Sequence, residues 1–116
     1  MMKARTDSDQ EIKPAQEAVM GQFRQAIDWA YGERIERVVL FGSRARGDHR
    51  PDSDYDVAVF LRDYRSLWGD LEGMSEAALD ILVDTGAVIS AKPFPAAAWN
   101  ENSAFMHEVR RDGREF

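Results

Sequence analysis

The sequence predicts a small α/β or α+β domain, in which helices cover a mixed β-sheet. Segments with helical periodicity and runs of β-forming residues follow one another in the order helix, strand, strand, helix, strand, helix. A loop of about a dozen residues joins the first two strands, and a helix separates the second strand from the third, as is usual between parallel strands. A chain of 116 residues can form one hydrophobic core, so we expect a single domain over residues 14–116.

The N-terminal helix is predicted to begin at Pro14, which suits a first helical turn, and to end near Gly32. Residues 1–13 are polar and weakly periodic, so we expect a flexible N-terminus there. Gly86 and Gly113 are placed to end the two later helices. The other predicted elements are strands over 34–41, 54–61 and 87–94 and helices over 66–85 and 102–111.

Composition and charge exclude several classes of protein. The 15 Lys and Arg against 21 Asp and Glu give a formal charge of −6, which argues against direct nucleic-acid binding. The absence of cysteine excludes disulfides, thiolate zinc sites and a thiol nucleophile. The longest apolar run, Val38 to Phe41, is far shorter than the ~20 residues that cross a bilayer. The N-terminus lacks the apolar core of a secretory signal, so we expect a cytoplasmic protein without membrane contact.

A glycine–serine turn follows the first predicted strand. Gly42 allows a ligand to approach the backbone, and Ser43 offers a hydroxyl and an N–H to phosphate oxygens. A short helix starting at Ser43 would add free N–H groups, and Arg44 and Arg46 add cationic side chains. It is not a P-loop, because Asp48 replaces the required lysine. By itself the turn is more often a plain bend with solvated arginines than a binding site.

Two aspartates lie at the start of the second predicted strand. Asp54 and Asp56 are two residues apart, so their side chains point to one face, with Cα atoms ~7 Å apart. Such a pair can hold Mg²⁺, which takes a few carboxylates together with substrate phosphates. Alone, the pair is also common on a solvated strand. Together, an anion-binding turn and a carboxylate pair on adjacent strands favour a site for a nucleoside triphosphate and its metal.

The combined pattern resembles a known family signature. Gly42-Ser43, ten intervening residues and then Asp54-Tyr55-Asp56 resemble the signature of the nucleotidyltransferase superfamily, which has the polymerase-beta-like fold. The fuller strings, Gly-Ser-Arg-Ala-Arg-Gly and Ser-Asp-Tyr-Asp-Val, are similar to its minimal nucleotidyltransferase branch. The small size of the chain and the order of its elements agree with this resemblance.

The resemblance implies roles for the two motifs. Gly42 and Ser43 would hold the triphosphate, with Arg44 and Arg46 as neighbouring cations, and the Asp54/Asp56 pair would be catalytic and hold Mg²⁺, with Mn²⁺ as the alternative. The implied reaction moves a nucleoside monophosphate, often AMP from ATP, to a hydroxyl and releases pyrophosphate.

One feature departs from the family pattern. A third carboxylate usually stands on the neighbouring strand and helps to deprotonate the acceptor, but the predicted strand 87–94 has no acid and places Ser90 near that position. General-base assistance is worth ~10²–10⁴ in rate. Asp52, just before the aspartate pair, is a candidate substitute. The sequence therefore supports nucleotide and metal binding more strongly than it supports turnover.

The resemblance also implies a partner. Minimal nucleotidyltransferases are often encoded beside a helical HEPN protein, a candidate ribonuclease toxin, against which they act as antitoxins, and some adenylylate a tyrosine of that partner. Two hypotheses stay open: an adenylyltransferase that modifies its HEPN partner, and a silent relative that neutralises the partner by binding. A third hypothesis is that both motifs are purely structural. The sequence leaves open the roles of His49 and the C-terminal arginines, and it makes Trp29, Trp68 and Trp99 core or interface anchors.

Overall fold

The structure is a computed structural model that describes residues 2–116, with side chains from residue 15 onward. The predicted flexible segment, residues 1–13, lies outside the described side chains. The elements are α1 (Met2–Tyr31), η1 (Gly32–Arg34), β1 (Ile35–Phe41), α2 (Ser43–Arg46), β2 (Tyr55–Leu61), α3 (Leu67–Thr85), β3 (Ile89–Pro95), η2 (Ala96–Asn100), α4 (Ala104–Asp112) and β4 (Arg114–Glu115).

Four strands form one mixed sheet in the order β3-β2-β1-β4. The β1 and β2 strands pair antiparallel, whereas β2 and β3, which α3 connects, pair parallel. This confirms the mixed sheet that the sequence predicts. In β2, six of the seven residues are buried, because the strand is central and both faces of the sheet are covered.

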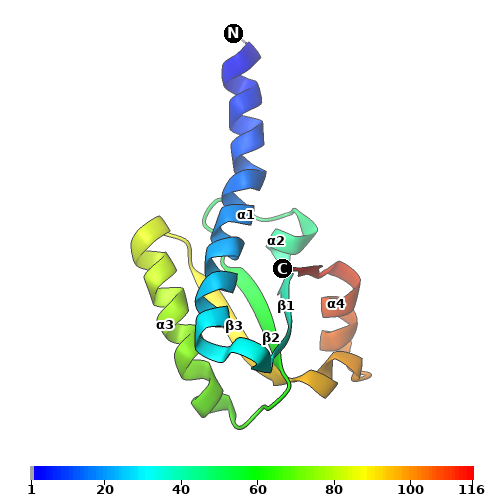
Figure 1. The fold of residues 1–116 in the computed structure, drawn as a ribbon. Helices are drawn as coiled ribbons and strands as arrows, with labels where there is room; N and C mark the ends of the chain where they lie inside the picture. The colour runs from blue at the N-terminus through cyan, green and yellow to red at the C-terminus, as the bar shows by residue number, and fades with distance from the viewer. Residues whose placement is uncertain (1) are drawn as a thin grey trace.

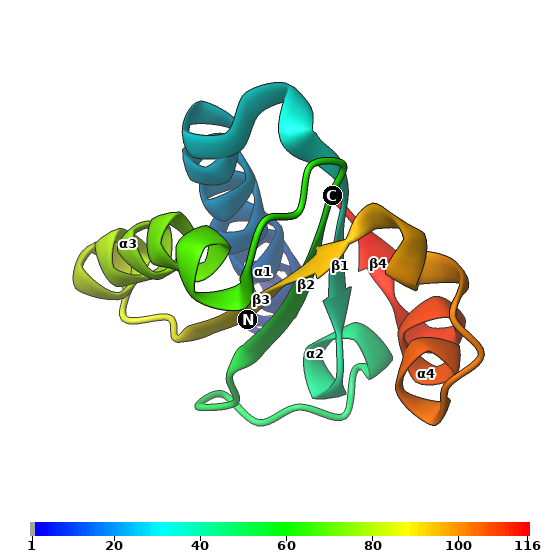
Figure 2. The ribbon, with the colours of Figure 1, turned by 90° about the horizontal axis from the view of Figure 1, so that it is seen from below.

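The two faces of the sheet are covered unequally. Helices α1 and α3 lie on one face, and α4 with η2 lies against the other (Figure 1, Figure 2). Side chains that alternate along β2 separate accordingly, so that Val57 and Val59 join the core under α1 and α3, while Ala58 and Phe60 face α4. The smaller cluster on the α4 side comprises Val39, Ala58, Phe60, Ala98, Met106 and Val109.

Three features differ from the prediction or refine it. Helix α1 begins at Met2, ahead of the start predicted at Pro14. Strand β4 is not predicted, because two residues carry no periodicity; it forms by pairing with β1, where the Phe116 N–H donates to the Val38 carbonyl at 3.0 Å. Gly86 ends α3 in the left-handed conformation, with φ +81°, as the sequence predicts. Within the described residues, every helix is too short or too polar to traverse a lipid bilayer.

Candidate functional site

The glycine–serine turn leaves the end of β1 and starts a short helix. Gly42 adopts φ +74° and is the N-cap of α2, and its carbonyl accepts hydrogen bonds from the N–H groups of Ala45 and Arg46 at 3.1 Å each. Because glycine has no side chain, the first turn of α2 has no side-chain cap. The short helix that the sequence suggests at Ser43 is therefore present, with Gly42 as an open N-cap.

Gly42 lies directly against Asp56. The pairing of β1 with β2 sets Phe41 opposite Asp56, at the position next to the turn. A Cβ atom added to Gly42 would lie 2.5 Å from Oδ2 of Asp56, closer than side chains tolerate. Glycine is thus required here both for its positive φ and for its lack of volume. The two motifs, separate in sequence, meet at one end of the β1–β2 pair, as the sequence predicts.

The two aspartates differ in their surroundings. Asp54 immediately precedes β2 and is exposed, whereas Asp56 is within β2 and half-buried. Burial raises the pKa of Asp56, and the negative charges of Asp54 and Glu108 raise it further, while Arg46 acts in the opposite direction. A carboxylate that is partly desolvated and faces other acids favours a bound cation or a proton.

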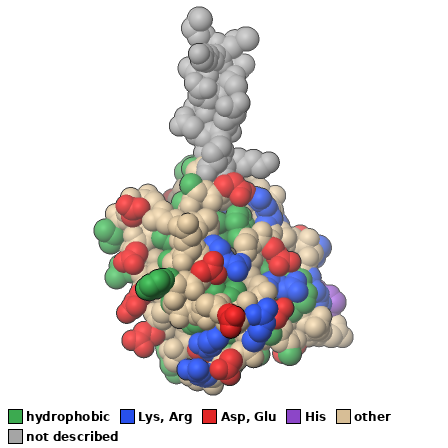
Figure 3. Space-filling model, in the orientation of Figure 1, with side chains coloured by type: hydrophobic (Ala, Val, Ile, Leu, Met, Phe, Trp, Pro, Cys, Tyr) green, Lys and Arg blue, Asp and Glu red, His purple; other side chains and the backbone are tan. Residues whose placement is uncertain are grey.

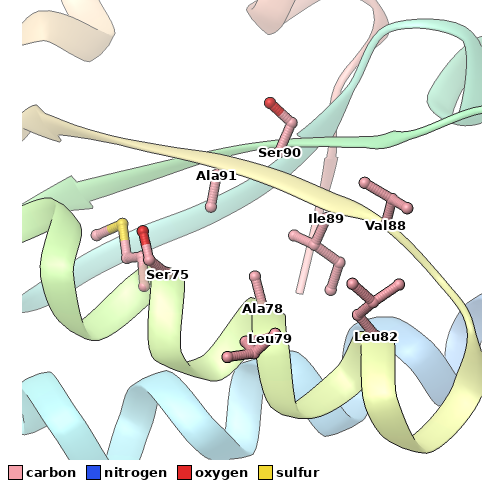
Figure 4. Close-up of a pocket in the computed structure, with 9 residues that line it drawn as sticks. Ser75, Ala78, Leu79, Leu82, Val88, Ile89, Ser90 and Ala91 are labelled. Carbon is pink, nitrogen blue, oxygen red and sulfur yellow. The ribbon is translucent and has the colours of Figure 1, made fainter.

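Ser90 occupies the position next to Asp56 on the neighbouring strand. The parallel register pairs Asp56 with Ser90, and Figure 4 shows the Ser90 side chain pointing away from α3, opposite to that of Ala91. Strand β3 contains no acid, so the place that the resemblance assigns to a third carboxylate holds a hydroxyl. Among the residues that the structure describes, no group of three acids, histidines or cysteines is arranged to hold a metal ion.

An open cavity of about 440 Å³ lies beside Asp56. Phe105 of α4 forms one wall, packing edge-on against Phe41 and stacking on Phe94, with ring centroids 5.3 and 5.7 Å apart. The lining residues are Phe41, Asp56, Val57, Ser90, Lys92, Phe94 and Phe105. The cavity thus combines an aromatic wall with a carboxylate, a hydroxyl and an ammonium group, and is open to an acceptor.

Arg44 holds the loop between the two motifs. Its guanidinium donates to the carbonyls of Ser53 at 2.9 Å and Pro51 at 3.1 Å, and it lies 4.0 Å from the centre of the Tyr55 ring. These contacts fix the segment that delivers the chain to Asp54. The nucleotide-binding role predicted for Arg44 stays a prediction, and the contacts give this residue a positioning role.

Arg46 is placed differently from Arg44. It pairs with Asp48 at 3.2 Å on the surface, and its charge lowers the pKa of Asp56. A surface ion pair of this kind is weak, so the guanidinium can exchange Asp48 for a ligand phosphate at little cost. Of the two arginines, Arg46 is thus the better placed to act on a ligand beside Asp56.

Two residues near Asp56, Lys92 and Glu108, are not among the site residues that the sequence predicts. Lys92 follows Ser90 by two residues and lies on the same face of β3. The alternation of side chains along a strand could therefore have predicted that Lys92 lies on the same side as Ser90. No local pattern marks Glu108, because α4 reaches the site only by packing across the sheet. The candidate substitute Asp52 is exposed in the loop.

The residues whose roles the sequence leaves open have mostly structural contacts. His49 is half-buried, and its Nδ1 is enclosed with no hydrogen-bond partner among the described residues. Arg110 donates to the Glu101 carbonyl at 3.0 Å, and Arg114 pairs with Glu17 at 2.6 Å. These C-terminal arginines therefore fasten α4 and β4 to the rest of the domain.

Comparison with known proteins identifies the family. The profile of the nucleotidyltransferase domain family matches residues 20–103, which include both motifs and β3. The chain belongs to this family. A Methanocaldococcus jannaschii protein named protein adenylyltransferase MJ0604 is 30% identical over 101 residues, covering 85% of this chain and 95% of the relative. A second protein adenylyltransferase from that organism, MJ0141, is 35% identical over 49 residues, covering 42% of this chain and 50% of the relative.

Solved structures share the fold. A toxin–antitoxin complex with AMP-PNP contains a chain with a TM-score of 0.56 and 16% identity, covering 80% of this chain and 68% of that chain. A chain of the toxin–antitoxin MntA-HpeT mutant has a TM-score of 0.55 and 15% identity, covering 80% of this chain and 70% of that chain. A structure described as a minimal nucleotidyltransferase has a TM-score of 0.52 and 23% identity, covering 90% of this chain and 92% of that chain. These likenesses confirm the nucleotidyltransferase fold that the motifs predict.

Proposed function

We propose that this domain transfers AMP from ATP to a hydroxyl of a partner protein. The observation that carries the proposal is the contact between Gly42 and Asp56, which brings an open helix N-cap and a cation-seeking carboxylate to one place. A nucleoside triphosphate needs both groups, one for its phosphates and one for its metal. The open cavity beside Asp56 supplies room for the acceptor.

The residues present fit a divalent cation that is shared with the nucleotide. Asp54 and Asp56 would hold Mg²⁺ or Mn²⁺, and the acid repulsion that raises the pKa of Asp56 would be relieved by the bound cation. When bound, the cation neutralises phosphate charge. Two carboxylates suffice for this fit, because Mg²⁺ commonly takes one or two carboxylates and completes its shell with phosphates and water.

The chain's own groups have distinct roles in the proposed reaction. Gly42 and Ser43 bind the triphosphate, and Arg46 offsets its charge. The acceptor oxygen forms a bond to the α-phosphorus while the bond from that phosphorus to the oxygen shared with the β-phosphorus breaks, and pyrophosphate leaves. The acceptor proton passes to solvent, since β3 has no acid to take it.

For the partner we propose a helical HEPN-type toxin in the cytoplasm, with a tyrosine as the acceptor and the chain acting as antitoxin. The support is that structural neighbours of this chain come from toxin–antitoxin complexes and that curated relatives carry the name protein adenylyltransferase. The formal charge of −6 suits a basic partner that handles RNA, because opposite charges speed association.

The alternative function is neutralisation by binding alone. It is favoured by one observation, the hydroxyl of Ser90 at the position where the family usually has a third acid. Loss of the base on β3 would slow transfer, while leaving every surface that touches a partner intact.

Labelled ATP tests the proposal. The chain is incubated with the product of the adjacent gene and with Mg²⁺ or Mn²⁺, and transfer of label to that protein is measured. Label on a tyrosine is expected, and its absence under every metal condition would contradict the proposal. The Asp54→Asn/Asp56→Asn variant separates the two functions: if it still protects cells from the partner, binding suffices.

A further inference from the structure

Helix α3 presents exposed hydrophobic side chains that the fold itself does not use. Among residues 15–116, five of the eight exposed large hydrophobic side chains lie on α3, and a sixth, Val88, follows it. Trp68 is 78% exposed, Leu79 58% and Val83 80%. The sequence predicts that Trp68 is a core or an interface residue. Its exposure excludes the core and leaves the interface prediction open.

Four of these side chains, those of Trp68, Leu79, Leu82 and Val88, line two adjoining hollows along α3. One hollow of about 310 Å³ lies between α3 and β3 (Figure 4). A second hollow, of about 490 Å³, lies along α3, and Ser75 and Leu79 line both. We call this surface the α3 groove and define it by Trp68, Leu71, Ser75, Leu79, Leu82 and Val88.

The spacing along the groove is that of a helix–helix seam. From Trp68 to Leu82 the groove residues of α3 are three, four, four and three residues apart, so they form one stripe on the helix. A stripe of this kind accepts the side chains of another helix. Addition of a strand to the free edge of β3 is disfavoured, since Pro93 and Pro95 lack the N–H groups that pairing requires.

The charge beside the groove sets the chemistry of the occupant. Helix α3 contains five acids and no Lys or Arg, and Glu72, Glu76 and Asp80 recur every four residues as an acidic row along one side of the stripe. In Figure 3, red carboxylates lie among green hydrophobic atoms at the left, over α3, while blue cationic atoms lie toward the middle, bottom and right. A second copy of this chain would bring two acidic rows together, which disfavours self-association.

We propose that the α3 groove binds a helix of the partner protein, which inserts an apolar seam and places Lys and Arg along the acidic row. The partner's identity rests on the proposed function. The edge strand β3 separates the groove from the candidate active site: Ser90 lines hollows on both sides of this strand, and its side chain points to the side of the Asp56 cavity. A partner helix seated in the groove would have to reach around this single edge strand to present its acceptor hydroxyl to the cavity.

Binding of the product of the adjacent gene to this chain, measured by calorimetry, tests the proposal. Leu79→Glu places a charge in the apolar seam and should weaken binding about 30-fold, the effect of losing a central interface contact. Its matched control is Trp29→Glu on α1, where Trp29 is 92% exposed outside the groove; this variant should bind within about 2-fold of the unaltered chain. Melting temperatures show that both variants stay folded.

A second pair of variants tests the charge. Glu76→Lys should weaken binding several-fold and reduce its dependence on salt, whereas Glu101→Lys, an exposed acid outside the groove, should leave both unchanged. Equal effects of Leu79→Glu and Trp29→Glu would overturn the proposal, as would no complex with the unaltered chain or a dimer of this chain that Leu79→Glu abolishes. Failure of AMP transfer with groove-dependent binding intact would instead refute only the enzymatic function.

Discussion

Two half- or fully buried aspartates, Asp56 and Asp70, have opposite electrostatic surroundings. Asp70, at the start of α3, is only 2% exposed, accepts a hydrogen bond from the Arg65 N–H at 2.8 Å and pairs with Arg34 at 2.8 Å. Burial alone would raise the pKa of Asp70, but these donors outweigh it and hold the pKa below its usual value. For Asp56, burial raises the pKa, and the negative charge of Asp54 raises it further.

The difference separates a carboxylate that the fold stabilises from the one that we propose as a metal ligand. The fold supplies the donors around Asp70, so its charge is already satisfied, and its pair with Arg34 joins α3 to η1. For Asp56 we propose that a bound cation compensates the charge. A carboxylate whose charge the fold leaves uncompensated is therefore the better candidate for chemistry.

Replacing Asp56 should have the largest effect. Asp56→Asn removes a metal ligand, so AMP transfer should fall at least about 10²-fold, as when a group that stabilises a transition state is lost. Mg²⁺ with ATP should raise the melting temperature of the unaltered chain and not that of the variant. Glu101→Gln, at an exposed acid outside the α3 groove, is the control, and equal stabilisation of Asp56→Asn by Mg²⁺ with ATP would show that Asp56 is not a ligand.

A side chain at Gly42 would fill the space beside Asp56 and so tests the contact between these two residues. Gly42→Ala should destabilise the fold by about 2 kcal/mol, because alanine is strained at φ +74° and its Cβ would meet Asp56. ATP binding should weaken as well. Gly21→Ala is the matched control: its Cβ meets open space on α1, so stability should rise by about 0.5–1 kcal/mol. Chemical denaturation and calorimetry measure both effects, and unchanged ATP affinity in Gly42→Ala would place the nucleotide elsewhere.

Neutralising Asp70 should affect stability and leave nucleotide binding unchanged. Asp70→Asn keeps the shape but loses charge-assisted hydrogen bonds with Arg34 and Arg65, at a cost of about 2 kcal/mol in the free energy of unfolding. ATP affinity should be unaltered once the protein is folded. A loss of ATP affinity in the folded variant would break the distinction between the two aspartates.

The pH dependence of stability should have opposite signs for the two residues. The folded pKa of Asp70 is lowered, so its contribution is present above the unfolded value of ~3.9 and is lost as pH falls below it. The folded pKa of Asp56 is raised, so ionising it costs stability as pH rises from ~3.9 through the raised value. Without metal, Asp56→Asn should therefore gain stability relative to the unaltered chain as pH rises above about 4, as denaturation curves would show. A difference that is constant with pH would contradict this.

The sequence by itself determined the elements and the motif. Hydrophobic periodicity located the main helices and β1 to β3 within a few residues, apart from the start of α1, because burial of one face imposes a regular spacing. The pair Gly42-Ser43 and the pair of aspartates were found because turn chemistry and metal chemistry demand particular residue types at short range. The lack of an acid in β3 could also be predicted from the sequence, because it depends only on which residues the strand contains.

Only the tertiary structure decided what lies beside these residues. It assigned Arg44 to the loop and Arg46 to the surroundings of Asp56, although both follow the same turn. It brought Phe105 to the cavity beside Asp56 by packing α4 across the sheet, and it left the stripe on α3 uncovered. Such placements depend on contacts between residues distant in the chain, and local propensity carries no information about them.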